Sequence, residues 1–219
     1  MSEPGLRERK KQQTRQLIAD TAHRLFRERG FDAVSVAEVA READVAEKTV
    51  FNYFPTKEDL FYSRLESFEA ELLDAIRQRK PGETVVAAFG RFVLQPRGLL
   101  AEKQGPEAHE AAAALTEITR IITDSPALLA REQQVFARYT ESLSALIAAE
   151  TGAAADDVEP WVVANALMGL HRGLIDYVRR RVLAGSVTPR RLARDVRAEG
   201  ERALARLQRG LGRYAAKRV

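Results

Sequence analysis

The side chains of this chain best suited to contacting base pairs lie within one short segment, AEKTVFNYF. Lys48 can donate to a guanine edge or to a phosphate, and Asn52 can bond an adenine edge in a bidentate way. Thr49 offers a methyl group and a hydroxyl, and Tyr53 can direct its hydroxyl to a phosphate. Phe51, an aromatic side chain on the outside of a short helix, suits a thymine methyl or a sugar. These residue types predict contact with duplex DNA.

Two short helices are expected to position these side chains. Val50 and Phe54 lie four positions apart, so a helix over about 46–54 would bury one apolar side and expose the polar one. Ser35 and Glu38 form a capping-box pattern, which predicts the start of the preceding helix. Two helices joined by a tight turn, the second with a polar outer face, can enter the DNA major groove.

A third helix is expected after this pair. Pro55 ends the second helix, because the residue before a proline disfavours helical dihedral angles. Thr56 and Asp59 repeat the capping-box pattern, and Lys57 falls in the first turn, where exposed N–H groups also suit a phosphate.

Charge is unevenly distributed although the net value is only +4. The N-terminal arm is basic and can lie along a phosphate backbone; it contains Arg7, Arg9, Lys10, Lys11 and Arg15. A second arginine-rich region follows residue 179. Asp195, Glu199 and Glu201 interrupt it, so a solvated helix face is the favoured interpretation.

Composition excludes several function classes. The chain contains no cysteine, and its three histidines (His23, His109 and His171) are not spaced as zinc ligands, so we expect no metal site and no cofactor. It shows no convergent catalytic cluster and no glycine-rich phosphate loop, which argues against an enzyme. No apolar run is long enough for a membrane span and no signal peptide is apparent, so a cytoplasmic protein is expected.

Helical periodicity dominates the chain, and no segment alternates as a strand does. The first helix is expected to end at Gly30. Later helices are expected over about 56–80, 83–94, 106–123, 125–151, 157–183 and 188–213. The predicted fold is all-α, with an N-terminal three-helix helix-turn-helix DNA-binding domain (1–55) and a C-terminal helical domain (56–219), to which the family resemblance described next assigns ligand binding and dimerisation.

The stretch from about Arg9 to Phe61 resembles the DNA-binding domain of the TetR family of bacterial repressors. The similarity is carried by LIADTAHRLFRERGFDAVSVAEVA and by VAEKTVFNYFPTKEDLF. It implies an all-helical homodimer that binds a palindromic operator. The positions that match the family's DNA contacts are Ser35, Lys48, Thr49, Phe51, Asn52, Tyr53 and Lys57. The chain departs from the pattern at Asp44, where the family usually has Gly, and at Ala46, where it usually has Ser as a helix cap.

A dimer surface is expected on the last two helices. The segment WVVANALMGLHRGLIDYV is apolar nearly all round, which predicts burial on more than one side. Gly169 and Gly173 leave it a thin side that another helix can approach. Two helices from each subunit could form a four-helix interface, as is common in the TetR family. The expected interface residues are Gly169, Gly173, Leu192, Val196 and Leu204.

The resemblance also implies an effector cavity in the C-terminal domain. Its expected lining is Phe89, Phe92, Ile118, Ile122, Phe136, Tyr139, Trp161, Asn165 and Met168. For any one of these, an ordinary core position is the alternative. Arg172 needs a partner if buried, which could be a backbone carbonyl, an acid such as Asp176 at i+4, or the other subunit. The C-terminal half also resembles a subgroup thought to bind acyl-CoA-like ligands.

Together these features predict a DNA-binding transcriptional repressor that is released from a palindromic operator by a hydrophobic small-molecule effector. In this hypothesis the helix over 56–80 transmits the change from the effector cavity to the DNA-binding helices. Two alternatives stay open: a sequence-nonspecific architectural DNA-binding protein that uses the basic segments, and an activator of the same fold.

Overall fold

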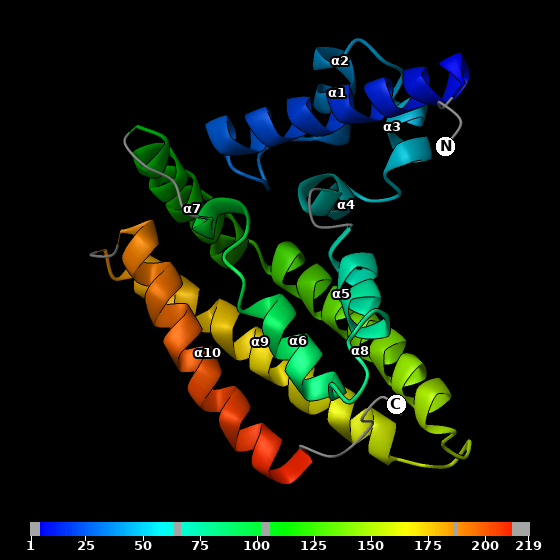
Figure 1. Cartoon of the computed structure of the whole chain (residues 1–219). Helices are drawn as coiled ribbons and strands as arrows, with labels where there is room; N and C mark the ends of the chain where they lie inside the picture. Colours follow the sequence, from blue (N-terminus) through cyan, green and yellow to red (C-terminus); the bar gives the residue numbers. More distant parts are fainter. Residues whose placement is uncertain (1–4, 64–66, 102–105, 186–187, 212–219) are drawn as a thin grey trace. The chain divides into compact units, whose positions relative to one another are not determined.

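The computed structural model describes residues 5–63, 67–101, 106–185 and 188–211, and no strand occurs within these ranges. The predicted all-α fold is confirmed (Figure 1). The helices are α1 (Leu6–Arg29), α2 (Val36–Glu42), α3 (Glu47–Tyr53), α4 (Lys57–Tyr62), α5 (Ser67–Arg77), α6 (Val85–Val93), the 3-10 helix η2 (Gly98–Leu100), α7 (Pro106–Asp124), α8 (Pro126–Thr151), α9 (Glu159–Leu183) and α10 (Pro189–Leu211).

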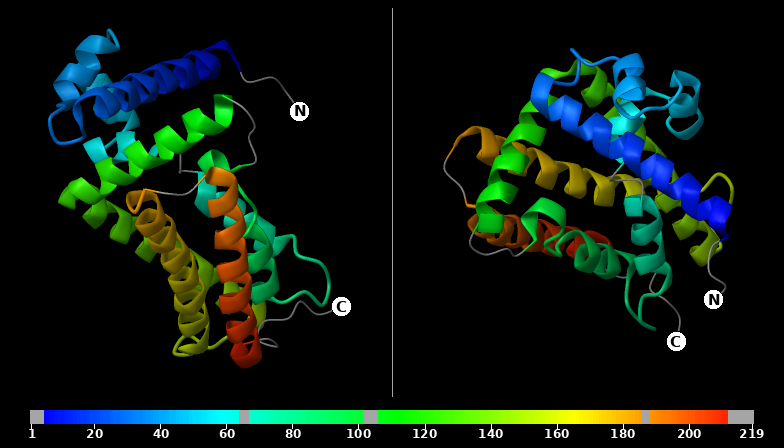
Figure 2. Two further views of the ribbon diagram at one scale, coloured as in Figure 1. Left: turned by 90° about the vertical axis from the view of Figure 1, so that its left-hand side faces the viewer. Right: turned by 90° about the horizontal axis from the view of Figure 1, so that it is seen from above.

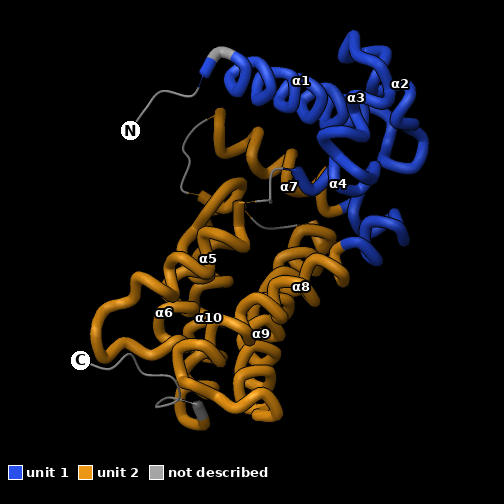
Figure 3. Tube along the Cα trace, turned by 90° about the vertical axis from the view of Figure 1, so that its right-hand side faces the viewer, with its two compact units in different colours: residues 1–66, 120–131 blue, residues 67–119, 132–219 orange. Residues whose placement is uncertain are grey.

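The chain divides into two compact units, coloured separately in Figure 3. Unit 1 comprises residues 1–66 and 120–131, and unit 2 comprises residues 67–119 and 132–219. The expected boundary at 55/56 therefore differs from the division of the structure, in which α4 belongs with the helix-turn-helix. The end of α7 and the first turns of α8 also belong to unit 1.

Unit 1 is built around an aromatic core. Helix α1 packs against α2 and α4, and its Phe26 ring lies 5.0 Å from that of Phe31 and 6.1 Å from that of Phe61 between centroids. Val50 and Phe54 of the α3 segment are also buried. Such burial of large apolar side chains is the main favourable term that holds the short helices together.

Side-chain contacts join the α7–α8 corner to the remainder of unit 1. The Tyr62 hydroxyl donates to the carbonyl of Leu128 at 3.1 Å, and the Ser125 hydroxyl donates to Asp32 at 2.9 Å. Arg131 Nη2 lies 2.6 Å from Asp59 Oδ1. Because Asp59 also accepts the Thr56 N–H in the capping box of α4, this arginine is tied to the start of that helix.

Unit 2 has one hydrophobic core, to which α5, α6, α8, α9 and α10 all contribute. Two views in Figure 2 show α10 running beside α9, and α10 also packs against α6. Thr84 caps α6 through its hydroxyl, which accepts from Ala87 N. Arg79 is buried, and it donates to the carbonyls of Ile76 and Glu83 and pairs with Glu150, so its charge is compensated.

The expected helix over 56–80 is described in two parts. The structure has α4 ending at Tyr62 and α5 spanning Ser67–Arg77, and residues 64–66 between them lie outside the described residues. The apolar positions Leu60, Leu72 and Ile76 are buried as expected. The pattern of apolar residues therefore identified the buried faces, and the continuity of the helix across 64–66 stays a prediction. The expected helix over 188–213 extends past the described residues, which end at 211.

Candidate nucleic-acid interface and ligand groove

Helix α3 has the orientation that its sequence predicts. Val50 and Phe54 are 0% and 1% exposed and anchor the helix, whereas Lys48, Asn52 and Phe51 are exposed. Phe51 is 44% exposed, a large apolar area for solvent to surround. The side chains of Thr49 and Tyr53 are half-buried at the edge of the same face. The exposed face thus offers a cation, an amide and an aromatic ring within about one and a half turns.

The turn between α2 and α3 depends on Asp44, which has φ of +52°. Aspartate tolerates this left-handed conformation better than most residues, so it can stand where the family usually has glycine. The Val45 N–H donates to the carbonyl of Ala40 at 3.0 Å and closes the turn. Ala46 occupies the N-cap of α3 without a side-chain cap, as its residue type predicts.

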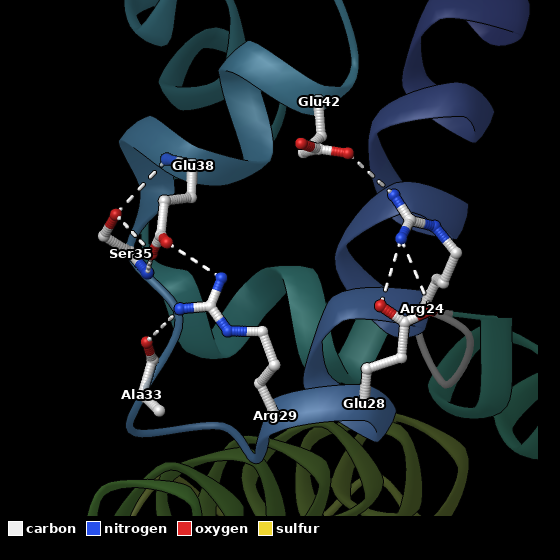
Figure 4. Close-up of polar contacts among 7 residues, drawn as sticks. All are labelled: Arg24, Glu28, Arg29, Ala33, Ser35, Glu38 and Glu42. Atoms are coloured by element: carbon white, nitrogen blue, oxygen red, sulfur yellow. Dashed lines mark hydrogen bonds and ion pairs between the residues drawn. The ribbon is translucent and has the colours of Figure 1, made fainter.

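The predicted capping box of α2 is confirmed (Figure 4). The Ser35 N–H donates to Glu38 at 2.8 Å, and the Glu38 N–H donates to the Ser35 hydroxyl oxygen at 3.2 Å. Arg29 adds an ion pair to Glu38 at 2.9 Å. The Ser35 backbone N–H and the Arg29 guanidinium, together with the serine hydroxyl, lower the pKa of Glu38 to about 2. The Ser35 hydroxyl is therefore engaged in the cap, and its contact with DNA stays a prediction.

A second ionic contact joins α1 to α2 in the same region (Figure 4). The Arg24 guanidinium lies 3.1 Å from Glu28 on its own helix and 3.1 Å from Glu42 at the end of α2. These groups are exposed, so each pair contributes modestly to stability. Their geometric effect is to hold the end of α2 in register with α1.

Two of the expected phosphate contacts are partly engaged within unit 1. The Lys57 ammonium lies 4.2 Å from the centroid of the Phe31 ring, and burial lowers the pKa of Lys57. The Arg15 guanidinium lies 4.6 Å from the centroid of the Phe54 ring. By contrast, Arg7, Arg9, Lys10 and Lys11 are exposed along the first turns of α1.

Unit 2 contains a groove of about 350 Å³ between α8 and α9. Helix α8 lines it with Gln133, Phe136, Ala137 and Thr140, and helix α9 lines it with Trp161, Asn165, Met168, Gly169 and Arg172. The volume lies at the lower end of the range for small-molecule sites. Phe136 and Met168 are buried and form its apolar part, while Trp161 is 46% exposed.

The groove includes some of the expected effector residues and not others. Phe136, Trp161, Asn165 and Met168 line it. Phe89, Phe92 and Tyr139 are instead buried in the core of unit 2, as the alternative interpretation of single positions allows. Ile122 lies in unit 1. Ile118 of α7 is half-buried and does not line the groove.

Other lining residues were missed because they are small or polar. Gln133 and Ala137, and likewise Phe136 and Thr140, lie four apart on one face of α8. The i, i+4 pairing was visible in the sequence, but nothing in it showed that α9 lies opposite this face. Asn165 Nδ2 donates to the carbonyl of Trp161 at 2.8 Å, which satisfies part of its amide within α9.

Arg172 is exposed and does not pair with Asp176, one of the partners considered for it. Asp176 lies 3.9 Å from Arg179 instead, and Arg179 also binds Glu132 of α8 through both terminal nitrogens. The Arg172 guanidinium carbon lies 5.1 Å from the centroid of the Phe136 ring. Within the described part of the chain, Arg172 has no ion-pair partner.

His171 is packed among aromatic rings next to the groove. Its ring stacks on that of Phe68 at 4.9 Å with an interplanar angle of 10° and lies 5.6 Å from that of Phe136. Burial lowers the pKa of His171 to about 4, because desolvation disfavours the charged form. The histidine is therefore neutral near neutral pH.

The expected dimer residues fall into two groups. Leu192 and Leu204 are buried within unit 2 at 1% and 9% exposure, and Val196 is half-buried. Gly169 and Gly173 are exposed, and a Cβ added at either would meet no heavy atom within 4 Å. The two glycines are therefore free to meet a second copy, and the role of all five residues in dimerisation stays a prediction.

In the described ranges, no three metal-ligating side chains gather into a possible ion site. None of the described helices combines the length and apolar character that crossing a membrane requires.

Comparison with known proteins agrees with this architecture. Residues 18–63 match the model of the bacterial regulatory proteins of the tetR family, and residues 104–211 match that of the MftR C-terminal domain. The HTH-type transcriptional regulator TcmR of Streptomyces glaucescens is 29% identical over 70% of this chain and 67% of its own length. MftR of Mycobacterium tuberculosis is 27% identical over 74% of this chain and 78% of its own length.

Two further relatives define the extent of the similarity. The nucleoid occlusion factor SlmA of Pasteurella multocida is 29% identical over 60% of each chain. Among solved structures, NalD of Pseudomonas aeruginosa, the secondary repressor of the MexAB-OprM multidrug efflux pump, has a TM-score of 0.53 at 20% identity and covers 89% of this chain and 96% of its own. That likeness concerns the fold. With a matching N-terminal domain, a matching C-terminal domain and regulators among its relatives, the chain belongs to the TetR family of bacterial regulatory proteins.

Proposed function

We propose that this protein is a transcriptional repressor that binds a palindromic operator as a homodimer and is released by a small-molecule effector. The observation that carries the proposal is the arrangement of α3, whose exposed side offers Lys48, Phe51 and Asn52 while Val50 and Phe54 anchor it. Lysine and asparagine on such a face can donate to guanine and bond adenine in the major groove. The repressor sign rests on the family resemblance.

The homodimer is supported by an unpartnered strip of α9. Val158, Val162 and Gly173 follow one another at helical spacing, with Gly169, which also lines the edge of the groove, between them, and the two valines are 63% and 52% exposed. Exposed apolar side chains beside glycines favour close helix–helix contact. A two-fold contact through this strip would present two copies of α3 to two half-sites about 34–36 Å apart.

The route from effector to DNA is proposed to run along α8. This helix is continuous from Pro126 to Thr151, with its first turns in unit 1 and the remainder in unit 2. Arg131 binds Asp59 in the cap of α4, and Gln133, two residues later, lines the groove. A ligand that binds better when α8 is displaced would shift the protein away from its operator-binding state, by no more than its differential affinity.

A mobility-shift assay on the promoter of the protein's own gene tests the proposal. We expect a dimer to bind one site despite excess bulk DNA, with log K falling by about 0.9 for each phosphate contact per log unit of salt. Equal affinity for the promoter and for bulk DNA would instead indicate the architectural alternative. Binding that appears only when ligand is added would indicate the opposite regulatory sign.

A further inference from the structure

The groove between α8 and α9 has one charged lining residue, Arg172, and no acidic one. In the described part of the protein, the other arginines of α8 and α9 whose contacts are resolved are mostly bound to carboxylates: Arg131 to Asp59, Arg138 to Glu69, Arg179 to Glu132 and Arg181 to Asp195. Arg172 has no such partner there, although Asp176 lies one helical turn away. An unpaired guanidinium at a groove favours an anionic ligand.

The aromatic ring of Phe136 orients this guanidinium. Its carbon lies 5.1 Å from the ring centroid, within the range of a cation–π contact. The planar fork of N–H donors on a guanidinium matches the two oxygens of a carboxylate. Gln133 on the opposite helix is exposed and can supply a further amide donor.

Apolar surface accompanies the charge. Trp161 stands at the side of the groove with nearly half of its surface exposed, while Phe136 and Met168 are buried below. A flat ring system between these side chains would cover the indole and contact the thioether. The volume of about 350 Å³ suits one or two rings better than a long chain.

We propose that the groove binds a small aromatic carboxylate, with its rings between Trp161 and Phe136 and its carboxylate paired with Arg172. This inference rests on the proposed function, because it names the ligand class of the proposed effector groove. It narrows the expected hydrophobic effector to an amphipathic acid.

The test uses the full-length protein and two isosteric probes, biphenyl-4-ylacetate and its neutral amide. Trp161 is the single tryptophan of the sequence, so the emission of the whole protein reports on the groove. We expect the acid to shift the Trp161 emission and to bind about tenfold tighter than the amide by calorimetry, a difference typical of a charge-assisted pair.

Two variants locate the anion. Arg172→Gln is expected to reduce the affinity for the acid to about that for the amide, and to change the amide affinity by less than about twofold. Arg180→Gln is the matched control, because Arg180 is an exposed arginine of the same helix that does not line the groove. It should bind both probes as the unmodified protein does.

Equal affinities for the acid and the amide would overturn the inference. So would an Arg172→Gln variant that binds the acid normally, or a Trp161 emission that neither probe changes. Operator binding is measured separately on the ligand-free protein. Its failure would contradict the proposed function, whereas the probe titrations report on the groove alone.

Discussion

At the scale of single residues, the exposed side of α3 determines what the helix-turn-helix can contact. Lys48 and Asn52 point away from the buried Val50 and Phe54, and both are exposed. A bidentate contact with a base contributes about 1–3 kcal/mol of discrimination. The two polar side chains should therefore carry much of the sequence preference, and Phe51 should add an apolar contact.

We predict that Lys48→Ala and Asn52→Ala each weaken binding to the preferred operator by about 1–3 kcal/mol and relax the sequence preference. Lys57→Ala should weaken all sequences about equally, since a phosphate contact carries no sequence information. Fluorescence anisotropy with the operator and with point-substituted operators measures both effects. An Asn52→Ala variant with unchanged affinity and preference would show that the contact face is misplaced.

The Glu38 carboxylate makes the start of α2 sensitive to acid. Its pKa is lowered to about 2 in the folded protein, so its contribution to stability is complete above its ordinary pKa of 4.5. The contribution declines as the pH falls from 4.5 towards 2. Glutamine at this position of a capping box can keep the hydrogen bond to the N-cap but carries no charge.

We therefore predict that the carboxyl carbon resonance of Glu38 titrates with a midpoint near pH 2 in the folded protein. In Arg29→Gln the midpoint should rise, because the arginine hydrogen bond that lowers the pKa is removed. A midpoint near 4.5 in the unmodified protein would contradict the capping geometry.

At the scale of elements, the starts of several helices could be predicted from local sequence signals. Prolines at or near the first turn correctly predicted the starts of α7, α8 and α10 near Pro106, Pro126 and Pro189. Both capping boxes, at Ser35 and at Thr56, were also predictable, since they depend on residues three positions apart.

Other features depend on contacts between distant segments and could not be predicted from local spacing. An apolar residue such as Phe89 or Tyr139 is equally suited to a hydrophobic core and to the lining of a ligand pocket. In the structure both residues lie in the core. Asp176 has Arg172 before it and Arg179 after it in the sequence, and spacing alone does not choose between them. In the structure it lies near Arg179, which also binds Glu132 of α8.

The exposed glycines of α9 provide a test of the dimer that uses two substitutions at one position. In a monomer Gly173→Ala should stabilise α9 by up to about 1 kcal/mol, because nothing within 4 Å obstructs a Cβ and alanine favours the helix. At a closely packed dimer contact, Gly173→Leu should instead raise the dimer dissociation constant at least about tenfold. Sedimentation equilibrium measures that constant.

The matched control is leucine at another exposed glycine. Gly210→Leu on α10 also adds a side chain where nothing lies within 4 Å of a Cβ. It should leave the dimer unchanged. A Gly173→Leu variant that dimerises as tightly as the control would place the dimer contact away from this strip of α9.

At the scale of the whole molecule, α8 connects the groove to the helix-turn-helix through the covalent chain itself. Arg131 is the last residue of α8 that belongs to unit 1. Its Nη2 lies 2.6 Å from Asp59 Oδ1. Both side chains are partly buried, so the pair is less screened than the surface ion pairs of α10. This single contact is the shortest described link between a residue of α8 and the cap of α4.

We predict that Arg131→Gln reduces the effect of a groove ligand on operator affinity by about 0.5–2 kcal/mol, while the affinity for the ligand itself stays nearly constant. Arg138→Gln is the control, because Arg138 also forms an ion pair from α8 but with Glu69 in unit 2. Operator affinity is measured with and without saturating ligand. Equal coupling in the two variants would exclude Arg131 as a link.

Nuclease footprinting of the protein on DNA fragments selected from its own genome tests the central claim most directly. The proposed arrangement of two α3 helices predicts one protected palindrome with two half-sites about one helical turn apart, and loss of protection for Asn52→Ala at the same protein concentration. Uniform protection of unrelated fragments, or a footprint that Lys48→Ala and Asn52→Ala leave unchanged, would contradict sequence-specific binding through α3.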